Sequence, residues 1–123
     1  MALLGLAYKA GTTTLRRSMA LEIAARLQKK GMTISFFDPT IKKEDVEKVF
    51  SGEFTYGKNI YDALSGAHAA MVITPWEGLL RLNWSNVKKA MCPPRLFFDS
   101  RNFLAAKADI IQKHAVTYRG VGR

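Results

Sequence analysis

The sequence is poor in cysteine, histidine and long apolar runs, and each shortage excludes a class of protein. A single cysteine in 123 residues excludes an intramolecular disulfide and a cysteine-based metal cluster, and it is typical of a reducing, cytoplasmic compartment. His68 and His114 are isolated and lack the spacing of a zinc site. No apolar run approaches the roughly 20 residues of a membrane-spanning helix, and the first residues lack the basic segment of a signal peptide. We therefore expect a cytoplasmic chain without a metal and without membrane contact.

Acidic residues are also scarce, because 10 Asp and Glu stand against 19 Lys and Arg, which gives a formal net charge of +9. Such a charge permits nucleic-acid binding. The basic residues are dispersed, however, often as adjacent pairs such as Lys29–Lys30 and Lys88–Lys89, which is typical of solvated helix faces. A phosphorylated small molecule needs only a few of these charges. We expect such a ligand and no nucleic acid, although a basic nucleic-acid-binding domain stays open as an alternative.

Apolar runs bounded by turn residues alternate with amphipathic stretches, which predicts one α/β domain over residues 1–123. The hydrophobic content of 48% is enough for a buried core. Strands are expected at residues 2–7, 32–37, 69–74, 95–98 and 115–118. Helices are expected at residues 16–30, 41–50, 59–65, 84–91 and 105–113, the first capped by Thr12 to Thr14. The polar segment 51–58 is expected to be the least ordered part.

This alternation predicts a Rossmann-like, three-layer fold with a doubly wound parallel sheet of about five strands in the order 3-2-1-4-5. Residues 69–74 are counted as the third strand and residues 95–98 as the fourth. Ligands bind such a sheet beyond the carboxyl ends of the strands, where the strand order reverses, here between strands 1 and 4. Lys9 follows the first strand and Arg101 follows the fourth, so we expect both to face one crevice. Two converging cations suit a phosphate or diphosphate.

Other roles for these residues stay open at this point. Lys9 is also compatible with a plain surface position at a strand end, and Tyr8 beside it with core packing. Arg101 comes two residues after Asp99 and could form a local ion pair with it.

The other candidate residues favour a binding module over an enzyme. The loop after Gly5 lacks the G-x-G-x-x-G spacing that grips a dinucleotide. Asp38 ends the second strand, where a dinucleotide-binding fold places its ribose-binding acid, but Asp38-Pro39 is also a common turn. Cys92 precedes two prolines with no base beside it, which is typical of a structural cysteine. Because no nucleophile–base pair or pair of carboxylates is apparent, we expect no catalytic residue in this chain.

Four segments, in order along the chain, resemble motifs of the C-terminal domain of the UDP-glucose/GDP-mannose dehydrogenase family. They are Gly5 to Ser18 (GLAYKAGTTTLRRS), Phe37 to Pro39 (FDP), Val72 to Glu77 (VITPWE) and Phe98 to Asn102 (FDSRN). The first is similar to the family's G-x-A-[FY]-K-x-x-T-x-D-x-R-x-S stretch, with Thr14 in place of the aspartate. The others are similar to its DP, T-x-W-x-x-F and D-x-R-N segments.

The resemblance implies a particular function. Members oxidise a nucleotide sugar, such as UDP-glucose, to its uronic acid with NAD as the cofactor. Their N-terminal domain binds NAD, and a central helical region carries the catalytic cysteine and the dimer contact. Residues 1–123 would then be the C-terminal nucleotide-sugar-binding domain of a longer dehydrogenase, expected to be a homodimer or a larger assembly.

Residue by residue, the resemblance implies that Tyr8, Lys9 and Arg101 bind the UDP-sugar substrate and that Arg16 approaches the NAD diphosphate. Cys92 does not match the catalytic cysteine, so the chain alone is expected to be inactive. A stand-alone nucleotide-binding regulatory module of the same fold is the alternative.

Overall fold

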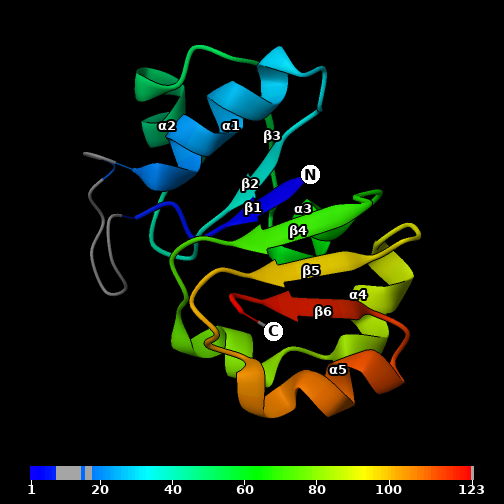
Figure 1. Ribbon diagram of the computed structural model, residues 1–123. Helices are drawn as coiled ribbons and strands as arrows, with labels where there is room; N and C mark the ends of the chain where they lie inside the picture. The colour runs from blue at the N-terminus through cyan, green and yellow to red at the C-terminus, as the bar shows by residue number, and fades with distance from the viewer. Residues whose placement is uncertain (8–14, 16–17, 123) are drawn as a thin grey trace.

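A parallel six-stranded sheet forms the centre of the molecule, in a computed structural model that describes residues 1–7, 15 and 18–122 (Figure 1). The strand order is β3-β2-β1-β4-β5-β6, and every neighbouring pair is parallel. The strands are β1 (Ala2–Leu4), β2 (Ser35–Phe37), β3 (Thr55–Tyr56), β4 (Ala69–Val72), β5 (Leu96–Asp99) and β6 (Thr117–Gly120). The order therefore reverses between β1 and β4, which lie side by side.

Helices cover both faces of the sheet, which gives three layers (Figure 1). The helices are α1 (Met19–Lys29), α2 (Lys43–Val49), α3 (Ile60–Leu64), α4 (Trp84–Ala90) and α5 (Ala108–Lys113), with 3₁₀ turns η1 (Glu77–Arg81) and η2 (Ala105–Lys107). α1 and α2 pack on one face, and α3, α4 and α5 contribute to the core on the other. No helix in the described residues is long and apolar enough to cross a membrane.

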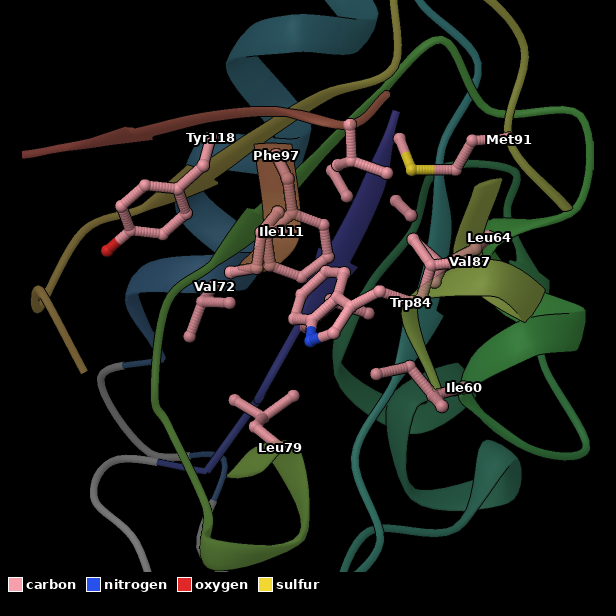
Figure 2. Packing of buried hydrophobic residues seen from close by; sticks show 14 of the residues in the cluster. Ile60, Leu64, Val72, Leu79, Trp84, Val87, Met91, Phe97, Ile111 and Tyr118 are labelled. Carbon is pink, nitrogen blue, oxygen red and sulfur yellow. The ribbon is translucent and has the colours of Figure 1, made fainter. Parts of the chain in front are cut away.

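Side chains that alternate along each strand build two separate cores. In β1, Leu3 belongs to the core under α1 and α2, whereas Ala2 and Leu4 belong to the larger core on the opposite face. Figure 2 shows this larger core, in which Trp84 of α4 packs edge-on against Phe97 of β5 with ring centroids 5.1 Å apart. Buried strands of this kind need apolar residues on both faces, which explains the nearly continuous apolar runs in the sequence.

The fold class and the order 3-2-1-4-5 are confirmed, and a sixth strand extends that order. The segment that forms the third strand, however, differs from the one expected. Thr55–Tyr56 forms the third strand, although residues 51–58 were expected to be the least ordered part. Residues 69–72 are therefore the fourth strand and pair with β1, and Leu96–Asp99 is the fifth. The expectation that strand 95–98 adjoins the first strand is wrong, because β4 lies between them.

The first helix also begins later than the sequence predicted. α1 starts at Met19, and the N-cap is Ser18, whose hydroxyl accepts a hydrogen bond from the Leu21 N–H. Thr12 to Thr14, expected to cap this helix, lie outside the described residues. The helix ends as predicted, because Gly31 takes up a φ of +87° that favours glycine directly after the C-cap.

Candidate functional site

Buried polar side chains gather at the carboxyl edge of the sheet. Four polar side chains are buried among the described residues, and they are Ser18, Asp38, Thr74 and Asp99. Asp38 and Thr74 follow β2 and β4, Asp99 ends β5, and Ser18 stands before α1. Burying such groups is unfavourable unless each finds a hydrogen-bond partner. Their partners therefore show which parts of the chain they stabilise.

Three of these side chains bind the backbone of Leu6 and Ala7, the two residues that continue from β1. Asp38 Oδ2 accepts hydrogen bonds from the Leu6 N–H at 2.7 Å and the Ala7 N–H at 2.9 Å. The Ser18 hydroxyl donates to the Leu6 carbonyl at 2.8 Å, and the Thr74 hydroxyl donates to the Ala7 carbonyl at 2.7 Å. Both backbone N–H groups and both carbonyls are thus bonded to side chains from three separate segments. We call Ser18, Asp38 and Thr74 the clamp.

Both carboxylate oxygens of Asp38 are already engaged. Oδ1 accepts from the Thr40 N–H at 2.8 Å and from the Thr40 hydroxyl at 2.7 Å, which closes the turn that the Asp-Pro sequence suggested. The Tyr56 hydroxyl accepts from the Asp38 N–H at 3.2 Å and lies 2.8 Å and 2.5 Å from the carbonyls of Asp38 and Ile41. Burial is the main cause that raises the pKa of Tyr56 to about 12. With its oxygens so occupied, Asp38 is not free to bind a ribose.

Gly5 allows the chain to enter the clamp. Its φ is +86°, and a Cβ at this position would lie 1.9 Å from the carbonyl oxygen of Thr74. The backbone at Thr74, after β4, therefore approaches Gly5, after β1, at a distance that only glycine permits.

The loop after β5 is held by the fourth buried polar side chain. Asp99, with no exposed surface, accepts hydrogen bonds from the Leu104 N–H at 2.6 Å, the Tyr118 hydroxyl at 2.9 Å and the Arg101 N–H at 3.2 Å. The Asn102 side chain bonds the backbone of Val121 in both directions, at 2.8 Å and 3.1 Å. These contacts fix the backbone on which the exposed Arg101 stands.

A cavity of about 400 Å³ opens beside Arg101, between the start of α1 and the ends of β4 and β5. Its lining combines apolar and polar side chains and consists of Met19, Ile23, Met71, Ile73, Thr74, Phe98, Ser100 and Arg101. A second depression lies on the other side of Thr74, between the ends of β1, β2 and β4, but its volume is only about 20 Å³. Among the described residues, the larger space at the carboxyl edge is therefore on the α1 side, next to Arg101.

Of the four predicted site residues, Arg101 is the one that lies among the described residues. Arg101 lines the cavity, at the edge where the sequence predicted a crevice. Asp99 and Arg101 do not form the ion pair that stayed open as an alternative. Asp99 instead accepts a hydrogen bond from the backbone N–H of Arg101. The one salt bridge among the described residues joins Arg26 to Glu22. Tyr8, Lys9 and Arg16 lie outside the described residues, so their roles stay predictions.

The described part of the chain also shows where the possible metal ligands and Cys92 lie. No group of three or more His, Cys, Asp or Glu side chains that could hold a metal occurs there. Cys92 is a partly buried free thiol at the end of α4. Its backbone N–H donates to the Ala67 carbonyl at 2.8 Å, just before β4 begins and therefore at the edge of the sheet opposite the cavity.

The clamp is not apparent from the sequence, in which Asp38 is typical of a turn and Ser18 and Thr74 indicate no role of their own. One signal could have pointed to it, since Asp38, Thr74 and Asp99 each come directly at or after the end of an apolar strand. Such a recurrence at one sheet edge indicates polar groups that meet in space.

Comparison with known proteins shows the family of the chain. Residues 2–106 match the UDP-binding domain of the UDP-glucose/GDP-mannose dehydrogenase family. The chain is 32% identical over 117 residues to UDP-glucose 6-dehydrogenase of Caenorhabditis elegans, which covers 88% of this chain and 24% of that enzyme. It is 33% identical over 123 residues to UDP-glucose 6-dehydrogenase of Rickettsia bellii, covering 99% of this chain and 27% of the relative.

A solved structure has the same fold. The UDP-D-ManNAc dehydrogenase of Pyrococcus horikoshii superposes with a TM-score of 0.70 and 26% identity, over 99% of this chain and 25% of that one. The present chain thus spans about a quarter of the length of these relatives. With a family match over most of its length, the chain belongs to the UDP-glucose/GDP-mannose dehydrogenase family and corresponds to its C-terminal UDP-binding domain.

Proposed function

We propose that this chain binds the UDP part of a nucleotide sugar in the cavity beside Arg101. The observation that carries the proposal is an exposed guanidinium at the rim of a cavity of about 400 Å³, at the carboxyl edge of a parallel sheet. Ligands of doubly wound sheets bind at this edge. The family match indicates a UDP-containing ligand, and the guanidinium of Arg101 can bind its phosphate oxygens.

The lining of the cavity suits a nucleoside diphosphate. A guanidinium presents a planar fork of N–H donors that matches phosphate oxygens and forms short, charge-assisted hydrogen bonds. Met71, Ile73 and Phe98 supply an apolar floor for a base or a sugar ring, and Ser100 adds a hydroxyl. Lys9 is proposed as a second cation for the same ligand, with Tyr8 packing beside it.

We further propose that the chain works as the C-terminal domain of a longer, NAD-dependent dehydrogenase that oxidises a UDP-hexose such as UDP-glucose to a UDP-uronic acid. The catalytic groups would come from the part of the enzyme that corresponds to the other three quarters of the relatives. Such an enzyme would be a homodimer or a larger assembly, and Arg16 would approach the NAD diphosphate from this domain.

The hydrogen bonding of Asp38 supports the proposal that NAD is bound mainly by another part of the enzyme. The usual ribose-binding position after the second strand is held by Asp38, and both of its carboxylate oxygens are engaged within the protein. We therefore assign no step of the reaction to NAD bound by this chain.

Titration of the 123-residue chain with UDP, UDP-glucose and GDP-mannose tests the proposal, with backbone amide resonances as the readout. A one-domain site buries only part of the ligand, so we expect a Kd for UDP on the order of millimolar, about −4 kcal/mol. Shifts should concentrate on residues 98–101 and on the cavity side of α1. A lack of saturable UDP binding, or tighter binding to RNA with a steep loss on adding salt, would contradict the proposal.

A further inference from the structure

We propose that the clamp residues Ser18, Asp38 and Thr74 are positioning residues for UDP binding, of which only Thr74 also lines the cavity. They hold the backbone of Leu6 and Ala7, which directly precede Tyr8 and Lys9 in the sequence. The inference rests on the proposed function, because its effect is read through UDP affinity.

The backbone of Leu6 and Ala7 is hydrogen-bonded by side chains and not by neighbouring strands. Regular sheet bonding finishes just before them, where the Gly5 N–H donates to the Phe37 carbonyl and the Ile73 N–H donates to the Leu4 carbonyl. After that point, the sheet no longer fixes the chain. Side chains take over, and all four of their bonds are between 2.7 and 2.9 Å long.

The clamp also brings together segments that are distant in sequence. Ser18 precedes α1, Asp38 follows β2, and Thr74 follows β4, so the contacts span 12, 31 to 32, and 67 residues. A strand end that only had to be solvated could use water for the same bonds. A carboxylate and two hydroxyls buried for this purpose indicate that one backbone direction is selected over others.

The direction matters because of what comes next in the chain. Tyr8 follows Ala7 directly and Lys9 is one residue further, and both are proposed to contact the UDP-sugar. A binding group must be held within about half an ångström of its working position by the residues that support it. Fixing the peptide at Ala7 reduces the ordering that the ligand must impose, which improves affinity without a contact.

Ser18 offers the cleanest test, because its hydroxyl does not line the cavity. Ser18→Ala removes the bond to the Leu6 carbonyl together with the α1 N-cap, whereas Ser18→Thr keeps a hydroxyl. Asn83→Ala is the matched control. Asn83 caps α4 in the same way, with its side chain accepting from the Asn86 N–H at 3.1 Å, but it has no part in the clamp.

We expect Ser18→Ala to raise the Kd for UDP about fivefold or more in the 123-residue chain, with Ser18→Thr restoring it to within about twofold. Asn83→Ala should lower stability and leave the Kd within about twofold. Asp38→Asn, which keeps the shape of the side chain but loses acceptors, should raise the Kd about tenfold. All titrations are made at a temperature where every variant is folded.

A second variant covers the case in which Ser18→Ala does not fold. Thr74→Val keeps the volume of the side chain and removes the hydroxyl that binds the Ala7 carbonyl. Because Thr74 also lines the cavity, UDP affinity is read together with the amide resonances of residues 8–10 in the ligand-free chain, which should move if the clamp positions them. Equal UDP affinity in wild type, Ser18→Ala and Thr74→Val overturns the clamp and leaves the UDP site standing. A wild-type chain that does not bind UDP overturns the proposed function instead, and unchanged amide resonances at residues 8–10 in Thr74→Val then overturn the clamp as well.

Discussion

The carboxylate of Asp99 accepts a hydrogen bond from the hydroxyl of Tyr118, 2.9 Å away, and both side chains are buried. Tyr118 belongs to β6, the last strand, and Asp99 holds the backbone of the loop that carries Arg101. The last strand is thereby connected to the candidate site through one buried pair.

Tyr118→Phe should therefore lower the free energy of unfolding by about 1.5–3 kcal/mol, the usual range for a hydrogen bond to a charged group. Tyr61→Phe is the control, because the Tyr61 hydroxyl accepts from the exposed Asn83 N–H and water can replace it. Chemical denaturation of both variants measures the difference. Equal losses in the two variants would mean that the Asp99–Tyr118 bond is no stronger than an exposed one.

Arg101→Ala should weaken UDP binding by about 1.5–3 kcal/mol, because it removes a charge-assisted contact, and should leave stability nearly unchanged because the side chain is exposed. Lys113→Ala, in the last turn of α5, removes the same charge far from the cavity and serves as the control. If the two variants bind UDP alike, the effect is general electrostatics and not a site.

Lys9→Ala should weaken UDP binding by an amount similar to that of Arg101→Ala, since both cations are proposed to contact one ligand. Arg16→Ala should leave the UDP affinity within about twofold, because Arg16 is proposed to face the dinucleotide. The same amide titration measures both variants. A larger loss in Arg16→Ala than in Lys9→Ala would reverse the two assignments.

Gly5→Ala should destabilise the chain far more than Gly31→Ala. Both glycines have nearly the same φ, +86° and +87°, so the left-handed backbone costs each alanine a similar amount, about 1–2 kcal/mol. Gly31 has no heavy atom within 4 Å of an added Cβ, whereas at Gly5 the Thr74 carbonyl oxygen would be 1.9 Å away. The difference between the two unfolding free energies measures the close approach of the β4 backbone to β1. Equal values would show that this approach relaxes without cost.

Tyr56 should ionise later than an ordinary tyrosine as the pH rises. Burial raises its pKa to about 12 in the folded chain, while an unfolded chain has a tyrosine pKa of about 10. The folded state thus keeps a proton that the unfolded state loses, so this contribution to stability is complete below about pH 10 and is lost toward pH 12. A titration of tyrosinate absorbance should show a late phase that Tyr56→Phe removes. A late phase that persists in Tyr56→Phe would assign it to another residue.

The sequence predicted the elements of the fold whose own residues show a clear apolar or turn pattern. Apolar runs at β1, β4 and β5 and glycine at the end of α1 each reflect a local requirement that a single segment reveals. β3 could not be predicted in this way, because it has only two residues and Thr55 is exposed. It forms because its neighbour β2 offers a parallel edge, with Phe36 paired to Tyr56, which is a tertiary effect.

Only part of the candidate site could be predicted from the sequence. The position of Arg101 followed from a general rule about strand ends, and the Asp38 turn followed from its Asp-Pro sequence. The second function of Asp38 was hidden, because one carboxylate oxygen serves the local turn while the other binds residues 31 and 32 positions earlier. No local pattern reports such a contact, since it depends on which strands become neighbours.

The short outer strands of the sheet also affect how the molecule behaves at high concentration. An open sheet can add further chains through the unpaired backbone of its edges, and long, flat, apolar edges do so most readily. Here one edge is β3, with the backbone of only two residues, and the other is β6, where Arg119 places an exposed charge. A two-residue strand and a strand with an exposed arginine both disfavour pairing of the sheet edges with another chain.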